Sequence, residues 1–400
     1  MVATLTRILG VSHLSLAEDA VQDALVEALR LWPHRGVPDN PRAWIVRVAR
    51  NRALDRLRRR GNWATKAAQI AHTLESLHEE DDTPQFASEL RDDQLRMVFL
   101  CCHPSLGRDS QVALALKLLG GFSVAEIARA FLAGRAAVAQ RLVRAKRTLR
   151  QGEVDFSIPS PDELPARLAP VLEVLYLMFN EGHGAHEGDS LVRRDLCREA
   201  IRLTLLVCDH PVIGSTEADA LAALLLFQGA RLATRADSDG DLILMAEQDR
   251  SQWDRAKLRQ ATLLLARAGR GERLSTYHLE AEIAGCHAMA PSYEETDWHR
   301  ILECYDALHA INPSPVVSVN RLVAVGRLQG AAIALAAGDR AGDWSRLADY
   351  YPALVVHAEL LAENGDSGRA RREFSQALEL AASRPVRRHI ERRLAALSLP

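Results

Sequence analysis

The segment GFSVAEIARAFLAGRAAVAQRLVRAKRTLR, residues 121–150, contains two helical patterns separated by a short turn. Ser123 and Glu126 have the spacing of a capping box, in which each side chain accepts a hydrogen bond from the backbone at a helix start. Gly134 lies in the turn, and a second helix with six basic residues and no acidic one is expected over Arg135–Arg150. Two helices joined by a short glycine-containing turn, the second of them basic, are typical of a helix-turn-helix.

A second basic segment, ARNRALDRLRRR at residues 49–60, contains six arginines and one acidic residue, Asp55. The whole chain has 50 basic and 52 acidic residues, so the arginines are concentrated locally. Arginines that neutralise phosphates release counterions, and they also stack on bases. One arginine-rich helix is equally compatible with a solvated surface, but its pairing with a helix-turn-helix favours contacts along one extended polyanion.

The residues before this basic segment predict two helices. Ser15 and Glu18 form another capping box, and the helix that they begin is expected to end at Pro33. Its core face includes Leu29 at helical spacing, while another face is acidic or amide and contains Asp19, Gln22, Asp23 and Glu27. Asn40 is expected to cap the next helix, with Pro41 at its first position. That helix is expected to pack on one face and to present a broad cationic surface on the rest.

Composition predicts an all-α protein of two or three domains. The 400 residues are more than one hydrophobic core usually supports, and Ala, Leu and Arg dominate while aromatic residues make up only 5%. Residues 75–93 contain eight acidic residues and one basic, which is typical of a flexible, solvated linker. The six cysteines are scattered, and no signal peptide or long apolar run occurs. We therefore expect a cytoplasmic protein with reduced thiols and no membrane association.

After Pro159 and Pro161 the basic clustering stops, and amphipathic helices follow to the end of the sequence. The stretch AELLAENGDSGRARREFSQALEL resembles a tetratricopeptide repeat, with Gly365 at the turn and packing positions at Ala370, Phe374 and Ala377. An earlier pair, Trp298 to Ile311 and Pro315 to Leu328, is similar but degenerate. Near that pair, the role of four residues stays open: Asp297, Trp298, Tyr305 and Asn320. They could capture a peptide on a concave surface or pack between helices.

Three segments in this order carry a family resemblance: LAEDAVQDALVEAL, PRAWIVRVARNRALDRLRRR and GFSVAEIARAF…VAQRLVRAKRTLR. They resemble regions two and four of the extracytoplasmic-function (group IV) sigma factors of bacterial RNA polymerase, and the tail resembles the subgroup with a C-terminal tetratricopeptide-like extension. The resemblance implies two small sigma-type helical domains followed by a larger repeat-like one. The expected boundaries are 1–61 for region two, 62–92 for the linker, 93–152 for region four and 153–400 for the extension.

The resemblance also implies a function, which is that of a non-enzymatic alternative sigma factor without a cofactor. Its partners would be promoter DNA, the clamp helices of the largest polymerase subunit and the flap of the second-largest subunit. The residues matching the polymerase-docking surface are Asp19, Gln22 and Asp23. The loop around His34, Arg35 and Gly36 matches the family loop that captures a flipped base of the −10 element. The full set of residues matching the −10 reader is His34, Arg35, Trp44, Arg47, Arg50, Asn51, Asp55 and Arg58. Those matching the −35 reader are Arg135, Gln140, Arg141, Arg144, Lys146 and Arg147.

The sequence departs from the family pattern in three ways. Only 14 residues precede Ser15, so we expect the first helix of region two to be clipped. The turn before the recognition helix reads Gly134, Arg135 and Ala137 where the family has Ser/Pro-Glu and Thr, so −35 base specificity does not transfer. Finally, Trp44 has packing as an alternative to DNA contact, and for Trp32 packing is favoured.

Other segments have possible metal chemistry, but none is expected to bind a metal. Cys101, Cys102 and His103 are adjacent at the end of an apolar helix, which favours buried thiols. The segment DSDGDLILMAEQDRSQWD has the acids of a calcium loop without their positions, so a turn followed by a capped helix is favoured. A polar loop is favoured over a metal or hydrolytic site for a third segment, FNEGHGAHEGD, with Glu181, His183, His186, Glu187 and Asp189.

Two further interpretations of the function come from other classes. The first is a helix-turn-helix regulator with a helical-repeat interaction domain, which would bind palindromic DNA as a dimer without engaging core polymerase. The second is an enzyme in the tail, centred on His183 and His186. The tail is also expected to receive a regulatory protein or peptide, or to fold back on the basic helices.

Overall fold

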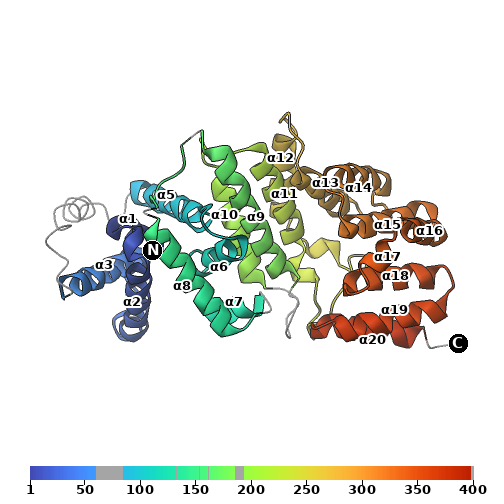
Figure 1. Cartoon of the computed structure of the whole chain (residues 1–400), viewed down its shortest axis with the longest axis horizontal. Helices are drawn as coiled ribbons and strands as arrows, with labels where there is room; N and C mark the ends of the chain where they lie inside the picture. Colours follow the sequence, from blue (N-terminus) through green and yellow to red (C-terminus); the bar gives the residue numbers. More distant parts are fainter. Residues whose placement is uncertain (60–83, 131–132, 153, 161, 185–192, 398–400) are drawn as a thin grey trace. The chain divides into compact units, whose positions relative to one another are not determined.

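The chain is α-helical and divides into two compact units, Met1–Val174 and Leu175–Pro400 (Figure 1). The computed structural model describes residues 1–59, 84–130, 133–152, 154–160, 162–184 and 193–397. Over these ranges there is no β-strand, and one isolated bridge joins Ala236 and Leu242. The all-α prediction is therefore confirmed.

The first unit begins with a small helical domain and continues into the helix-turn-helix. Its helices are α1 (Val2–Leu9), η1 (Val11–His13), α2 (Leu14–Arg35), α3 (Pro41–Arg59), α5 (Pro84–Cys101), α6 (Arg108–Leu118), α7 (Val124–Ala130), α8 (Arg135–Gln151) and the first part of α9 (Leu164–His183).

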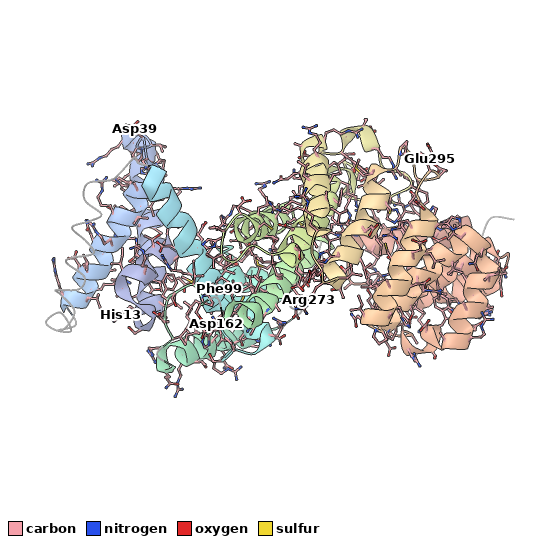
Figure 2. The ribbon with its side chains drawn as sticks, turned by 90° about the horizontal axis from the view of Figure 1, so that it is seen from above. His13, Asp39, Phe99, Asp162, Arg273 and Glu295 are labelled. Atoms are coloured by element: carbon pink, nitrogen blue, oxygen red, sulfur yellow. The ribbon has the colours of Figure 1, made fainter. Side chains whose placement is uncertain are left out.

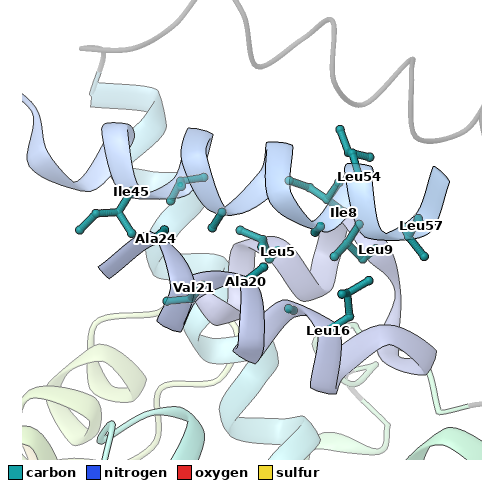
Figure 3. Packing of buried hydrophobic residues seen from close by; sticks show 14 residues of the cluster. Leu5, Ile8, Leu9, Leu16, Ala20, Val21, Ala24, Ile45, Leu54 and Leu57 are labelled. Carbon is teal, nitrogen blue, oxygen red and sulfur yellow. The ribbon is translucent and has the colours of Figure 1, made fainter. Parts of the chain in front are cut away.

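Helices α1, α2 and α3 share one apolar core, shown in Figure 3. Leu5 and Ile8 of α1 pack with Val21 of α2 and with Ile45 and Leu54 of α3. Each such side chain contributes about 1.5–3 kcal/mol on burial. Helix α1 precedes α2 and supplies core residues, and the expectation that the family's first helix is clipped stays a prediction.

Helix α2 differs from its prediction at both ends. It begins at Leu14 with His13 as N-cap, so Ser15 lies inside the helix and the predicted Ser15–Glu18 capping box does not form. The helix also continues through Pro33 to Arg35, because a proline in an exposed last turn interrupts few hydrogen bonds. It ends at Gly36, whose φ of 81° favours glycine.

Helix α3 begins as predicted, whereas α5 begins earlier than the expected domain boundary. The Asn40 Oδ1 atom accepts a 3.1 Å hydrogen bond from the Ala43 N–H, and Pro41 is the first helical residue. Since α5 begins at Pro84, residues 84–92 of the expected linker are helical, which is consistent with proline's fit to a first helical position. Residues 62–83 of that linker lie outside the described residues.

The helix-turn-helix has the predicted cap. The Ser123 N–H donates to Glu126 Oε2 at 2.7 Å, and the Glu126 N–H donates to Ser123 Oγ at 3.2 Å, so this capping box is confirmed. The buried face of α8 consists of Val138, Leu142, Ala145 and Leu149. Before it, α5 buries a run of apolar residues around Phe99, labelled in Figure 2.

The second unit is a succession of helices in which neighbours along the chain pack together. After the end of α9 its elements are α10 (Arg194–Cys208), α11 (Thr216–Ala230), η2 (Leu232–Thr234), η3 (Arg250–Gln252), α12 (Arg255–Ala268), α13 (Thr276–Met289), α14 (Trp298–Ile311), α15 (Pro315–Gln329), α16 (Ala331–Ala341), α17 (Asp343–Arg346), α18 (Tyr351–Glu363), α19 (Ser367–Leu380) and α20 (Arg384–Ala396).

The two predicted helical pairs of the tail are present. The first pair, α14 and α15, matches the expected bounds to within one residue. In the second pair, Gly365 has a φ of 85° at the turn between α18 and α19. Ala370, Phe374 and Ala377 are fully buried against α18, as the repeat pattern predicts.

Candidate nucleic-acid interface

One side of α3 is neutralised by the acidic residues of α2. Arg52 Nε lies 3.1 Å from Glu27 Oε2, and Arg56 pairs with Asp23 and, at 3.8 Å, with Asp19. These pairs are partly exposed, so each contributes at most about 1 kcal/mol to stability. The expected cationic surface is therefore narrower than predicted, because two of the arginines face α2.

The opposite side of α3 presents polar side chains to solvent. Arg47, Asn51, Asp55 and Arg58 are all exposed, and their spacing of three or four residues places them on one face. Asp55 lies 3.7 Å from Arg58, and Arg50 Nη2 lies 3.5 Å from Asn51 Oδ1. The structure thus brings together five of the residues predicted to contact the −10 element.

The predicted base-capturing loop is partly helical. His34 and Arg35 are exposed but belong to the last turn of α2, and only Gly36 and the residues up to Asn40 form the connection to α3, with Asp39 labelled in Figure 2. They are helical because Pro33 does not end α2, contrary to the prediction.

The two tryptophans beside this connection pack on one another. Trp32 and Trp44 meet edge to face with ring centroids 5.6 Å apart, and both pack against the core of α1, α2 and α3. Packing is thus the role that the structure favours for both, although each remains partly exposed.

The outer face of α2 has apolar residues that the sequence patterns did not single out as a surface. Asp19 and Gln22 are exposed, whereas Asp23 is half-buried and paired with Arg56. Val26 and Leu29 continue the same face at helical spacing, with exposed fractions of 47% and 76%. Leu29 was predicted to lie in the core, which is wrong. We call Asp19, Gln22, Val26 and Leu29 the α2 stripe.

The recognition helix α8 presents most of its predicted DNA-binding residues to solvent. Arg135, Gln140, Arg144 and Arg147 are exposed, while Arg141 lies 3.3 Å from Asp109. Val143, with 66% of its surface exposed, was missed because an apolar residue resembles the core pattern.

Lys146 differs from the other basic residues of α8. Its ammonium group pairs with Glu18 of α2, and Lys117 of α6 lies 3.5 Å from the same carboxylate. Glu18 therefore joins α2 to the helix-turn-helix, and Lys146 points toward this contact.

A second ion-pair contact between helices is centred on Asp93 of α5. This side chain is fully buried, and its Oδ1 atom lies 2.9 Å from both Arg7 Nε of α1 and Arg96 Nη1. The two positive charges offset the cost of removing this carboxylate from water, so the contact depends on both arginines.

The cysteines that begin the CCH segment are buried, as predicted. Burial raises the pKa of the Cys102 thiol to about 12, and it also raises the pKa of Cys101. His103 Nδ1 lies 2.7 Å from Ser105 Oγ. In the described part of the chain, no group of three or more His, Cys, Asp or Glu residues is arranged to hold a metal ion.

The other candidate segments have structural roles where they are described. His183 ends α9, but His186, Glu187 and Asp189 lie outside the described residues. The predicted turn and capped helix are confirmed, because Asp237 Oδ1 accepts hydrogen bonds from the Asp239 and Asp241 N–H groups and Asp254 caps α12.

Near α14, packing explains three of the four residues whose role was open. Asp297 caps α14 at 2.9 Å from the Arg300 N–H, Trp298 packs on Tyr293, and burial raises the pKa of Tyr305 to about 12. Asn320 is exposed.

Comparison with known proteins finds three family models along the chain. Residues 2–62 match the family model for sigma-70 region 2, residues 96–149 match that for sigma-70 region 4, and residues 167–269 match a family of unknown function. A protein of Rhizobium meliloti (strain 1021), described as uncharacterized, is 39% identical over 373 residues, which cover 93% of this chain and 87% of the relative.

The two matched regions, with their helix-turn-helix, define a protein of the sigma-70 class that has a promoter-recognition role. Such domains imply interaction with RNA polymerase and promoter DNA. The chain belongs to the extracytoplasmic-function sigma factors, in a form that carries a C-terminal helical extension. No helix in the described ranges is long and apolar enough to cross a lipid bilayer.

Proposed function

We propose that this chain binds core RNA polymerase and directs initiation at promoters, with α3 melting and reading the −10 element and α8 reading the −35 element. The observation that carries the proposal is the asymmetry of α3. Its Arg52 and Arg56 side is neutralised by α2, while its Arg47, Asn51 and Arg58 side is exposed to solvent.

Strand separation by α3 would require binding energy but no chemical step. Unstacking costs a few kcal/mol per base, and contacts to the extracted bases and the backbone offset that cost. Arg47 and Arg58 suit phosphate contacts, and Asn51 suits a base edge because its amide both donates and accepts. The proposal therefore includes no catalytic residue and no cofactor.

Helix α8 would enter the major groove by its N-terminal half, as recognition helices do. Arg135 and Gln140 lie in that half, and Arg144 and Arg147 follow on the exposed surface. Val143 lies among them and suits apolar contact with a thymine methyl group.

The α2 stripe is the proposed docking surface for the clamp helices of the largest polymerase subunit. It combines an exposed carboxylate and amide with two exposed apolar residues, Val26 and Leu29. Apolar residues rimmed by polar ones typify protein interaction sites. Contact of region four with the flap of the second-largest subunit belongs to the same proposal.

Promoter-specific run-off transcription with core polymerase and the full-length chain tests the role of α3. The variant carries Arg47→Ala together with Asn51→Ala, both exposed, and the matched control is Arg273→Ala, an exposed arginine of the second unit. We expect a loss of transcript of at least about tenfold for the variant, from two contacts worth roughly 1 kcal/mol or more each, and none for the control. Equal transcription by both proteins contradicts the −10 assignment.

Polymerase docking is tested separately by co-purification of core polymerase. Leu29→Asp should abolish association, because a charge would replace an apolar contact, whereas Ile333→Asp in the second unit should not. Binding to palindromic duplex DNA as a dimer, with no dependence on Leu29 and no association with core polymerase, would support a conventional regulator instead.

A further inference from the structure

Three arginines of the second unit lie together without an acidic partner. Arg231 follows α11, Arg235 follows η2, and Arg250 begins η3. Arg231 donates to Gln228 Oε1 at 2.8 and 3.0 Å, and Arg235 donates to the backbone carbonyl of a neighbouring helix end. Across the described residues, none of the three forms an ion pair within 4.0 Å. We call Arg231, Arg235 and Arg250 the arginine cluster.

The charges of Arg235 and Arg250 act on Arg231, and Arg231 and Arg235 are poorly hydrated. Burial, reinforced by the charges of Arg235 and Arg250, lowers the pKa of Arg231 to about 9. Burial also lowers the pKa of Arg235 to about 10. Cations removed from water without a counter-charge are costly to a fold, so the cluster is a strongly favourable place for an anion.

Two neutral histidines adjoin the cluster and leave polar atoms unsatisfied. Burial and the nearby arginines lower the pKa of His183 and bring that of His287 to about 4. In the described structure, His183 Nε2, His287 Nδ1 and Arg250 Nη2 are buried and make no hydrogen bond. Such atoms in a native structure indicate a missing partner.

Arginines elsewhere in the same unit do have acidic partners. Arg267 pairs with Asp219, and Arg393 pairs with Glu359. The carboxylate that most affects Arg250 is Glu294, which is exposed and does not pair with it among the described contacts. Among the residues that the structure describes, the lack of a counter-charge is therefore a property of the arginine cluster and not of the unit.

Arg250 also lines a cavity of about 480 Å³ between α12 and the end of α13. Its guanidinium lies 4.6 Å from the Trp253 ring centre, and its Nη1 donates to the carbonyls of His287 and Ala290 at 2.7 and 2.9 Å. Leu258 and Met289 give the cavity an apolar wall. Its volume falls in the range of small-molecule sites.

We propose that the second unit binds a small organic anion, whose carboxylate or phosphate group pairs with Arg250 in the field of Arg231 and Arg235 and whose apolar body occupies the adjoining cavity. The planar guanidinium fork suits an oxyanion, and Trp253 and Met289 suit an apolar or aromatic body. Arg255 and Arg259, which are exposed residues of the same lining, would attract the anion. The proposal does not depend on the promoter function.

Fluorescence titration of the full-length chain with 1-anilinonaphthalene-8-sulfonate tests this site, because the probe joins an anion to an aromatic body. We expect saturable binding that Arg250→Gln and Arg231→Gln each weaken about tenfold or more, the loss expected for a charge-assisted contact. The exposed Arg273→Gln is the matched control and should leave binding unchanged. Near-ultraviolet circular dichroism verifies that each variant keeps its tertiary structure.

A second variant avoids the buried residues altogether. Arg255→Gln with Arg259→Gln changes only exposed positions, so it should weaken the probe several-fold without loss of folding. Competition by 1-naphthoate against 1-naphthyl phosphate then distinguishes a carboxylate from a phosphate ligand.

The neutral analogue N-phenyl-1-naphthylamine isolates the role of charge, and it should bind more weakly than the sulfonate. Equal affinity for the two probes, or equal affinity of Arg250→Gln and Arg273→Gln for the sulfonate, would overturn the proposal. Displacement of the probe by an acidic peptide but by neither naphthyl anion would also overturn it, in favour of a peptide site.

Thermal unfolding separates a binding role from a structural one. Arg231→Met should raise the melting temperature of the unliganded chain, because it removes a desolvated charge and its repulsion from two others. It should also reduce the stabilisation that a fixed concentration of 1-naphthyl phosphate gives the unchanged protein. A lower melting temperature with that stabilisation intact would mean that Arg231 only supports the fold.

Discussion

The two units of this chain use arginine in opposite ways. In the first unit, Arg52 and Arg56 of α3 meet the carboxylates of α2, and Arg42, Arg47 and Arg58 of α3 are exposed to water. In the second unit, Arg231 and Arg235 are poorly hydrated, and the described contacts give them no carboxylate. The hydrated arginines of α3 are therefore suited to a large polyanion, which adds binding energy without being needed for folding. The arginine cluster is suited to a small anion that replaces lost hydration.

The largest effect is expected for Asp93→Asn, which removes the buried counter-charge of Arg7 and Arg96. We expect a loss of about 3–5 kcal/mol in the stability of the contact between α1 and α5, because one partner of a buried ion pair remains uncompensated. Hydrogen exchange resolved along the chain measures it. The control Asp55→Asn changes an exposed pair and should cost less than about 0.5 kcal/mol. Similar losses for both would remove the distinction between buried and exposed pairs.

A smaller effect is expected for Arg267→Met, which leaves the buried Asp219 without its partner. We expect this change to destabilise the second unit by about 2–3 kcal/mol, whereas Arg231→Met should stabilise it. Protection of α11 amides in hydrogen exchange reports both changes. If both substitutions destabilise α11, the arginine cluster has a compensating charge and the contrast fails.

The pH dependence of the second unit sharpens the contrast further. His287 has a pKa of about 4 when folded, against an ordinary value of 6.5, so the unfolded state binds more protons between these values. Stability should therefore be complete above about pH 6.5 and fall as the pH drops toward 4, by on the order of 3 kcal/mol. His287→Gln should remove this part of the slope in α13 exchange, while the exposed His299→Gln should keep it. Identical slopes for the two variants would contradict the assignment.

The smallest effect concerns two basic residues of α8. Arg144→Ala should weaken binding to duplex DNA carrying the −35 element by about 1 kcal/mol and reduce the salt slope by about 0.9. Lys146→Ala should do less, because Lys146 is paired with Glu18 in the unbound chain. Fluorescence anisotropy over a range of salt concentrations measures both. A larger change for Lys146 would mean that its pair with Glu18 opens at little cost.

Local patterns predicted the elements whose ends depend on one side chain. Asn40 with Pro41 and Ser123 with Glu126 gave correct helix starts, since each pair is satisfied within four residues. The start of α2 was missed because Glu18 serves a contact with Lys117 and Lys146, more than ninety residues away in the sequence. Tertiary partners of this kind leave no local signal.

The candidate sites show the same limit. The residue types of the −10 surface were evident in the sequence, but the pairing of Arg52 and Arg56 with α2 was not, so the width of the cationic surface was overestimated. Leu29 fits the helical period of the core and is nevertheless exposed. The arginine cluster was missed altogether, because nothing in the sequence around Arg231, Arg235 and Arg250 indicates that the described part of the fold gives them no acidic partner.

The carboxylate of Glu18 sets up a competition. A DNA phosphate that approaches Lys146 must compete with the Glu18 carboxylate for its positive charge. Contact of this lysine with the duplex and its ion pair with Glu18 therefore oppose each other, and each weakens the other by the same factor. Contact with DNA would consequently weaken the ion pair between α8 and α2, while Lys117 of α6 would keep its contact with Glu18.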